Sequence, residues 1–155
     1  MTYNEIRNEF AELLNCHDLT IGVAEFGTNG EITKAMHDRF DDQTFHGGLV
    51  CCSAKAAHNI LGVSYAVPVK SKFAASEMAE RVRRDFIADI AVSAILCEGE
   101  AKAPRVLAGF LIGTGEFNWK YYEVPEADRE DLVLQVASMR ILREMERQVV
   151  DYYGK

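Results

Sequence analysis

The feature that most constrains the fold is a glycine-containing segment that follows a short apolar run. The run 19–24 favours a strand and the stretch after residue 30 favours a helix, and between them lies Ala24-Glu25-Phe26-Gly27-Thr28-Asn29-Gly30. A strand that passes through glycines into the start of a helix gathers unpaired backbone N–H groups and a partial positive charge. That geometry suits a phosphate or a developing oxyanion, although Phe26 stands where a nucleophile would be useful.

The charge of the chain and its lack of long apolar runs restrict its partners. With 155 residues, 48% of them hydrophobic, residues 1–155 fit one globular domain that can bury roughly two-thirds of its unfolded surface. The formal net charge is −7, whereas nucleic-acid binders depend on clustered Lys and Arg. No apolar stretch approaches the roughly 20 residues that span a bilayer, and residues 1–9 lack the pattern of a signal peptide. We expect a soluble, cytoplasmic protein that binds neither nucleic acid nor membranes.

The cysteines and histidines show no spacing typical of a metal site. Cys16, Cys51, Cys52 and Cys97 form no C-x-x-C pair, and the four histidines are scattered. In a reducing compartment such cysteines remain free thiols. We therefore predict no metal site and no cofactor.

Hydrophobic periodicity divides the chain into alternating helices and strands. Helices are predicted over residues 3–15, 29–39, 55–61 and 71–86, and again after residue 128. Strands are predicted over residues 19–25, 47–53, 88–96, 106–112 and 117–124. The third strand is apolar on both faces, so we expect it at the centre of the sheet.

Local signals define several of the element ends. Thr28 and Glu31 match a T-x-x-E capping box for the second helix, and Gly62 should stop the short third helix. Residues 41–43 are predicted to form a turn and residues 98–104 a loop.

Two further signals concern the C-terminal third of the chain. Residues 113–115, Gly-Thr-Gly, indicate a hairpin between the last two strands. Asp128 is expected to cap the final helix, whose apolar stripe would consist of Leu132, Val136, Met139 and Leu142.

This order of elements predicts an α/β fold. Strands separated by helices imply parallel pairs with right-handed crossovers, and the hairpin adds one antiparallel strand. The result is a three-layer α/β/α sandwich over a mixed, mostly parallel five-stranded sheet. In such sheets ligands gather beyond the carboxyl ends of the parallel strands, which here means residues 25–30 and the ends of the second and third strands.

Several segments match the order and spacing of motifs in a known family. Its first motif reads Ala-Glu-Ser-Cys-Thr-Gly-Gly at the place of residues 24–30. Its second strand reads approximately Gly-Gly-Val-Val-Ala-Tyr-Ser, where this chain has Gly47-Gly48-Leu49-Val50-Cys51-Cys52-Ser53 and then Leu61-Gly62-Val63. Further matches are Ser71, Met78-Ala79-Glu80, Arg83-Arg84 and Ala88-Asp89. On these motifs, residues 15–150 resemble the C-terminal domain of the CinA (competence/damage-inducible protein) family, whose active members are nicotinamide-nucleotide amidases.

The same resemblance implies that functional side chains are missing here. The family's presumed nucleophilic serine is Phe26, a tyrosine on the second strand is Cys52, a lysine falls at Ala57 and an arginine falls near Val133. The family's loop Thr-Gly-Ile-Ala-Gly-Pro is replaced by residues 95–100, Ile-Leu-Cys-Glu-Gly-Glu. These departures argue against amidase chemistry on a phosphate-bearing substrate.

The candidate ligand-binding residues are Glu25, Phe26, Gly27, Thr28, Asn29, Gly30, Cys52 and Ser53. Glu25 and Thr28 either line a pocket or only stabilise the start of the second helix, with Thr28 as its cap. Phe26 either packs in the core or covers a flat ring.

We interpret the chain as a catalytically inactive CinA-like homologue that binds a small nucleotide-like ligand or assembles into an oligomer. The alternative is an active amidohydrolase on nicotinamide mononucleotide or a related amide, with Cys52 or Thr28 as the nucleophile. For Cys52, the neighbouring Lys55 or His58 would have to lower the thiol pKa.

A third reading is a purely structural protein without a ligand. Phe117, Trp119 and Tyr121 alternate along a late strand, and an aromatic-rich edge strand needs cover. This pattern favours a homo-oligomer, in agreement with the self-association of the family.

Overall fold

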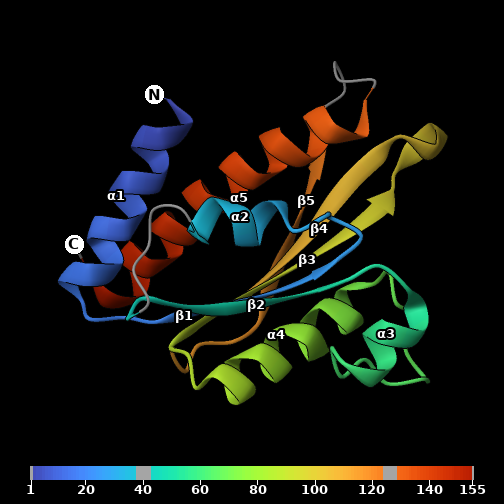
Figure 1. The fold of residues 1–155 in the computed structure, drawn as a ribbon, viewed down its shortest axis with the longest axis horizontal. Coiled ribbons are helices and arrows are strands. Elements are labelled where there is room, and N and C mark those ends of the chain that lie inside the picture. Colours follow the sequence, from blue (N-terminus) through green and yellow to red (C-terminus); the bar gives the residue numbers. More distant parts are fainter. Residues whose placement is uncertain (1, 38–42, 124–128, 155) are drawn as a thin grey trace.

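A five-stranded sheet with helices on both faces forms this protein (Figure 1), and the computed structural model describes residues 2–37, 43–123 and 129–154. Along the chain the elements are α1 (Tyr3–Cys16), β1 (Ile21–Phe26), α2 (Glu31–His37), β2 (Phe45–Cys51), α3 (Ala54–Asn59), α4 (Lys72–Phe86), β3 (Ile90–Glu98), the 3-10 turn η1 (Glu100–Lys102), β4 (Pro104–Ile112), β5 (Asn118–Glu123) and α5 (Glu130–Tyr153).

The strand order β2-β1-β3-β4-β5 confirms the mixed sheet that the sequence predicts. The first strand, β1, pairs in parallel with both β2 and β3. The pairs β3–β4 and β4–β5 are antiparallel, so β4 alone runs opposite to the other four strands. As expected, the apolar third strand lies at the centre, and residues 113–115 close the hairpin through a bond of 2.9 Å from Gly115 N to Ile112 O.

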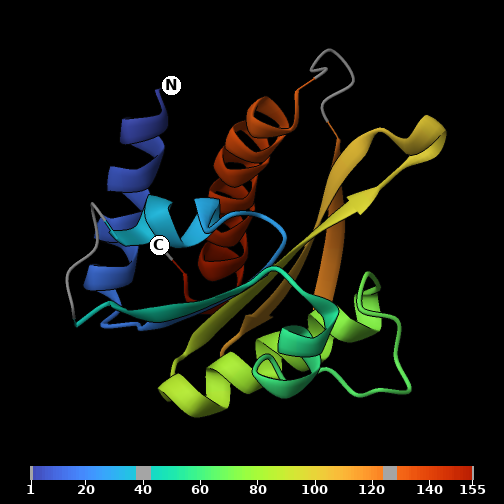
Figure 2. The same ribbon diagram turned by 45° about the vertical axis from the view of Figure 1, so that its right-hand side comes forward.

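The helices form two layers, one on each face of the sheet (Figures 1 and 2). On one face α1, α2 and α5 bury residues such as Phe10, Met36 and Ile141. On the other face α3 and α4 bury residues such as Ala57 and Met78. The predicted three-layer α/β/α sandwich is therefore correct. Figure 2 also shows that the β3–β4 hairpin extends beyond the helical layers.

Strand pairing explains why several element bounds differ from their predicted positions. The antiparallel ladder of β3 and β4 runs from Ile90↔Ile112 to Glu98↔Pro104, so it extends into the predicted loop at 98–104 and leaves only η1. At the other side, β2 ends at Cys51 because β1 offers no partner beyond Phe26. Cys52 and Ser53 therefore lie outside the observed strand, although the prediction placed both in it.

The second helix begins two residues later than predicted, because Asn29 and Gly30 have φ angles of +56° and +75°. Left-handed residues cannot belong to a right-handed helix. The predicted end of this helix and residues 41 and 42 of the predicted turn lie outside the described residues. The helices predicted at 3–15, 55–61 and 71–86 are confirmed with small changes at their ends.

The apolar stripe predicted for the last helix is correct at Leu142, which is buried, and in part at Met139, which packs against the core. In α5 the buried face consists of Val133, Leu134, Ala137, Ser138, Ile141, Leu142, Met145 and Val149. Leu132 is exposed, and Val136 and Met139 are only partly buried. The predicted cap, Asp128, lies outside the described residues, and Arg129 at the N-cap position makes no side-chain capping bond.

The fourth helix lies directly on the sheet backbone because glycine leaves room for it. A Cβ on Gly22 of β1 would lie 2.5 Å from Cγ1 of Val82 in α4. At its N-terminus, Ser71 caps the helix by accepting a hydrogen bond of 3.2 Å from Ala74 N.

None of the described helices combines the length and the hydropathy needed to cross a lipid bilayer.

Candidate functional site

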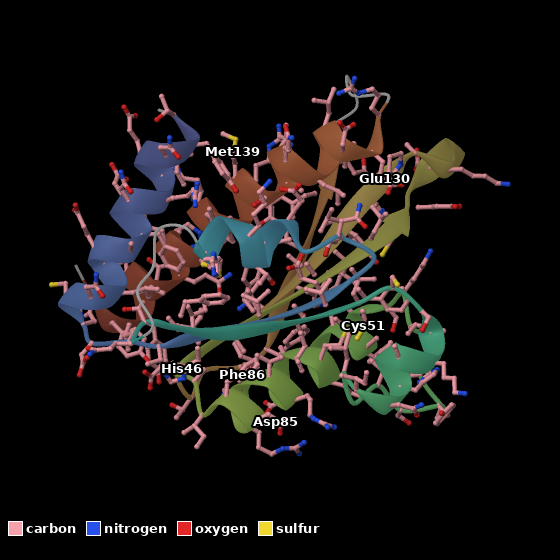
Figure 3. All side chains as sticks on the ribbon, viewed as in Figure 1. His46, Cys51, Asp85, Phe86, Glu130 and Met139 are labelled. Carbon is pink, nitrogen blue, oxygen red and sulfur yellow. The ribbon has the colours of Figure 1, made fainter. Side chains whose placement is uncertain are left out.

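The three parallel strands end at the same edge of the sheet, which is where the sequence predicts a site. Phe26 at the end of β1 pairs with Cys51 of β2 and with Ile95 of β3. Figure 3 labels His46 and Cys51 near opposite ends of β2, and Glu130 at the start of α5 on the Cys51 side of the molecule. The edge thus gathers the turn after β1, the end of β2 and the β3–β4 hairpin.

The turn after β1 presents backbone N–H groups, as its glycines predict. Gly27, Asn29 and Gly30 all have positive φ angles, of +76°, +56° and +75°. The Gly27 amide donates to Cys51 O at 3.0 Å. Within the part of the chain that the structure describes, the amides of Thr28, Asn29 and Gly30 have no acceptor. Successive free amides in such a turn form a cradle for an anion.

Glu25 serves the helix that follows, and it does so from a fully buried position. Its carboxylate accepts hydrogen bonds from the backbone amides of Ile32 (3.2 Å) and Thr33 (2.8 Å), and also from the Thr33 hydroxyl. These bonds satisfy amides at the N-terminus of α2, where helices lack internal acceptors. The structural reading of Glu25 is therefore confirmed.

Thr28 does not cap the helix, in contrast to the prediction. Its hydroxyl is buried and donates to Oε1 of Glu25 at 2.6 Å, while the Glu31 amide bonds to the backbone carbonyl of Thr28 at 3.1 Å. The capping role falls to Glu25 because its carboxylate reaches the helix amides from the end of the strand. The Thr28 proton is thus committed to a carboxylate that already holds three other donors.

Phe26 packs in the core and does not form a platform for a ligand. Its side chain is 8% exposed and belongs to the apolar cluster on the α3–α4 face, with Ala24, Cys51 and Leu61. The packing alternative of the sequence analysis is therefore the correct one.

At the end of β2, Cys52 and Ser53 have separate roles. The Cys52 thiol is free and exposed, whereas Ser53 is the N-cap of α3 and accepts from Ala56 N at 3.1 Å. His58, one of the two bases expected to activate Cys52, makes other contacts. Its Nδ1 lies 2.8 Å from Val63 O, and its ring stacks on Tyr65. Among the described residues no hydrogen bond joins Cys52 to Lys55 or His58.

A cavity of about 360 Å³ lies beside this turn, around the end of the central strand. Gly27 connects the two, because a Cβ there would lie 3.3 Å from Cβ of Leu96, which lines the cavity. The lining residues are Lys70, Leu96, Cys97, Glu98, Lys102, Pro104 and Glu130. The sequence predicts a site at the end of the third strand, but it does not single out Lys102 of η1, or Lys70 and Glu130, which come from distant segments.

The cavity combines two lysines with a buried thiol. Burial raises the pKa of the Cys97 thiol, an effect that the Arg105 and Lys70 cations oppose. No carboxylate of the described segments forms an ion pair with Lys70 or Lys102. The lining thus holds two ammonium groups, of Lys70 and Lys102, together with two carboxylates, of Glu98 and Glu130. Ammonium groups can bind a phosphate or carboxylate.

Comparison with known proteins places the chain in a family. The family model of the CinA C-terminal domain matches residues 3–112. The chain belongs to the CinA C-terminal domain family. The match covers both the turn after β1 and the whole of β2 and β3, so the resemblance expected from the motifs is correct.

Solved structures of CinA superfamily proteins share the fold. The protein from Enterobacter cloacae has a TM-score of 0.84 at 24% identity, over 96% of this chain and 93% of its own. A competence or damage-inducible protein from Enterobacter asburiae gives 0.84 at 23%, over 96% and 99%. The superfamily protein from Escherichia coli gives 0.83 at 22%, over 95% and 90%. No functionally curated protein matches the sequence.

Three of the four positions to which the family resemblance assigns functional side chains are apolar and buried in this CinA domain. Phe26, Ala57 and Val133 are 8%, 0% and 1% exposed and lie on β1, α3 and α5. The fourth, Cys52, is a free and exposed thiol. Within the described ranges, no three His, Cys, Asp or Glu side chains cluster closely enough to hold a metal.

Proposed function

We propose that this CinA domain binds a small anionic, nucleotide-like ligand at the carboxyl edge of its sheet without hydrolysing it. The observation that carries the proposal is that a turn with free backbone amides lies next to a position that lacks the family's presumed nucleophile. Thr28, Asn29 and Gly30 offer free amides, while Phe26 is packed in the core beside them. Binding groups remain at the edge, and a packed ring occupies the position of the family's presumed nucleophile.

The shape and charge of the edge support an anionic ligand. The cradle and the cavity meet at the Gly27–Leu96 contact, and on the cavity side Lys70 and Lys102 supply ammonium donors next to the carboxylates of Glu98 and Glu130. A phosphate on the cradle would leave the remainder of a nucleotide-sized molecule in reach of the cavity. Charge-assisted hydrogen bonds from amides and ammonium groups stabilise such anions.

Amide hydrolysis needs a nucleophile with a base in hydrogen-bond reach. The Thr28 hydroxyl donates a hydrogen bond to Glu25 and is buried. For Thr28 to attack a substrate, that hydrogen bond would first have to break. The exposed Cys52 keeps one alternative open: it is the only free thiol at this edge of the described chain that reaches solvent. A hydrolase that uses Cys52 is therefore the second candidate function.

The experiment combines turnover and binding on the same purified protein. Incubation with nicotinamide mononucleotide at high protein concentration should release no ammonia. Ammonia release that Cys52→Ala abolishes would establish the second candidate and contradict the proposal.

Binding is tested by thermal shift against a panel of mononucleotides and inorganic phosphate, because a ligand that binds only the folded state raises its stability. We expect a shift for wild type that falls at least severalfold in Lys70→Ala or Lys102→Ala. The matched control is Lys55→Ala, an exposed lysine outside the cavity lining, which should behave as wild type. The absence of a shift with every member of the panel would contradict the ligand-binding proposal.

The four free cysteines suit a reducing compartment such as the cytoplasm, which is where we propose that the protein acts.

A further inference from the structure

The hydroxyl of Tyr122 is a buried polar group that the fold leaves without a partner. Tyr122 lies on β5 with 5% of its surface exposed, and its hydroxyl forms no hydrogen bond with any residue that the structure describes. A buried hydroxyl in this state destabilises the fold, and native proteins contain few of them. The unpaired hydroxyl therefore indicates a partner from outside the chain.

Tyr122 lines a groove between β5 and α5, which lie side by side (Figures 1 and 2). The groove has a volume of about 780 Å³ and continues over α5 to α1. Lys120 lies on its β5 side, and Arg140, Glu144 and Arg147 lie on its α5 side. Over the described ranges, its lining has no residue in common with the cavity at the carboxyl edge, so the two sites are separate.

Most charged residues of the groove already have a partner within the chain. The lining contains equal numbers of cationic and anionic side chains. Arg147 donates to Glu144 Oε2 at 2.9 Å and to Asp151 Oδ2 at 2.8 Å. The other lining residues with charged or polar partners are Glu123, Arg143 and Glu146.

Lys120 and Arg140 are the two cations of the lining that form no ion pair with a described residue. The Lys120 ammonium lies 5.5 Å from the ring centroid of Tyr122. Arg140 donates one hydrogen bond, of 2.9 Å, from Nη1 to the carbonyl oxygen of Glu123, the residue next to Tyr122. Because a guanidinium has five N–H donors, Arg140 keeps donors for a ligand. Two available cations thus flank the residue with the unpaired hydroxyl.

We propose that this groove binds the phosphate group of a small ligand, held by Lys120 and Arg140 and by a hydrogen bond from the Tyr122 hydroxyl. Ammonium and guanidinium groups form short, charge-assisted hydrogen bonds with phosphate oxygens. Burial raises the pKa of Tyr122, so its hydroxyl keeps the proton and donates it to an anion. The inference goes beyond the proposed function and does not depend on it.

Access to the hydroxyl requires one side chain to move. The hydroxyl oxygen is buried, and the Glu144 carboxylate and the Arg147 cation both act on it electrostatically. The Arg147 side chain is 61% exposed, and ion pairs of such exposed cations contribute little to stability. On binding, Arg147 turns from Glu144 toward the phosphate, which uncovers the hydroxyl and adds a third cation. Glu144 keeps the hydrogen bond of 3.2 Å from Gln148 Nε2.

The test is an amide NMR titration of the full chain with inorganic phosphate at constant ionic strength. The signals of residues 120–122 and 140–147 should shift to saturation, and Arg140→Gln or Lys120→Gln should weaken this binding about tenfold, as expected for the loss of a charged hydrogen-bond donor. Arg84→Gln, which removes an exposed cation of α4, should bind as wild type. Shifts that are absent, or that grow linearly without saturation, would overturn the proposal. The signals of residues 27–30 report the carboxyl edge separately, so failure of this site and failure of the proposed function are distinguishable.

Tyr122→Phe separates a binding role from a structural one. The variant should melt at a higher temperature than wild type without phosphate, yet bind phosphate about threefold or more weakly, since it lacks one hydrogen-bond donor. The matched control is Tyr3→Phe, which removes a hydroxyl that lies 3.0 Å from Ser138 Oγ. It should melt at a lower temperature and bind phosphate as wild type. Unchanged phosphate binding in Tyr122→Phe would overturn the proposal.

Discussion

The hydroxyl of Thr28 donates a hydrogen bond of 2.6 Å to the buried carboxylate of Glu25, which links the turn after β1 back to the strand itself. Two polar residues of the motif thus bind each other, and Glu25 also accepts hydrogen bonds from amides at the start of α2. A motif typical of a ligand-binding edge is used here, at these two positions, to hold the backbone of that edge in place.

This relationship predicts a clear difference between two substitutions of Thr28. Thr28→Val removes a buried donor from Glu25 and should lower the free energy of unfolding by about 1–3 kcal/mol. Thr28→Ser retains the hydroxyl and should cost less. Urea denaturation monitored by circular dichroism measures both values. A Thr28→Val protein as stable as wild type would show that the bond does not contribute to the native state.

Restoring a serine at the position of the family nucleophile should harm the protein without giving activity. Phe26→Ser replaces a packed ring in the α3–α4 cluster, and large-to-small changes of this kind cost about 3–5 kcal/mol. The matched control is Phe73→Ser on α4, where the ring is 60% exposed and the expected change is within about 0.5 kcal/mol. Denaturation and ammonia release from nicotinamide mononucleotide are measured together. Amidase activity in Phe26→Ser would contradict the proposal that the remaining catalytic groups are absent.

A buried hydroxyl without a partner predicts a stabilising substitution. Tyr122 is 5% exposed, and its hydroxyl has no hydrogen-bond partner among the described residues. Burial raises the pKa of Tyr122, and the Glu144 carboxylate raises it further. Tyr122→Phe should therefore increase the free energy of unfolding by about 1 kcal/mol, because an unsatisfied polar group is removed.

The control for Tyr122 is Tyr3→Phe. The Tyr3 hydroxyl lies 3.0 Å from Oγ of the buried Ser138, so its removal should destabilise the protein by about 1 kcal/mol. Opposite signs for the two variants in the same thermal and urea measurements are the expected result. Equal losses would mean that the Tyr122 hydroxyl is satisfied in solution.

The four cysteines should fall into two kinetic classes toward a thiol reagent. Cys16 and Cys52 are exposed, whereas Cys51 and Cys97 are buried. Burial raises the pKa of both buried thiols above the ordinary value of 9.0. Since the thiolate is the reactive form, two thiols should react rapidly at neutral pH and four in denaturant. Fast labelling of Cys51 or Cys97, mapped by mass spectrometry, would contradict the packing.

The raised thiol pKa values also set a pH dependence of stability. The folded state favours the protonated thiols more strongly than the unfolded state does, so this contribution is complete below the unfolded pKa near 9. It is lost as the pH rises through the higher folded pKa. The free energy of unfolding should therefore decline above about pH 9 more steeply in wild type than in Cys97→Ala.

The helices and strands could be predicted because they depend on patterns along the chain. Alternating apolar residues and glycine turns located all five strands, and the central position of β3 followed from apolar residues on both of its faces. The stripe of α5 could not be found in the same way. Two neighbouring stripes, one through Leu132 and one through Val133, have the same helical period, and contact with α1 and β4 decides which one is buried.

The site shows the same division. The free amides of Thr28, Asn29 and Gly30 were expected from glycine at a strand–helix junction. The cavity residues Lys70 and Glu130 could not be predicted. Lys70 precedes α4 and Glu130 begins α5, and these helices lie on opposite faces of the sheet. Their proximity to Leu96 depends on how those helices pack.

Sequence by itself determined the family, the order of the elements and the edge at which the parallel strands end, because these depend on local spacing and on rules of parallel crossovers. Tertiary structure alone decided what each side chain at that edge does: Glu25 accepts from the helix amides, Thr28 serves Glu25, and Phe26 is buried. The physical reason is that a buried polar group takes whichever partner the packing brings within about 3 Å, and the spacing of residues along the chain does not contain that information.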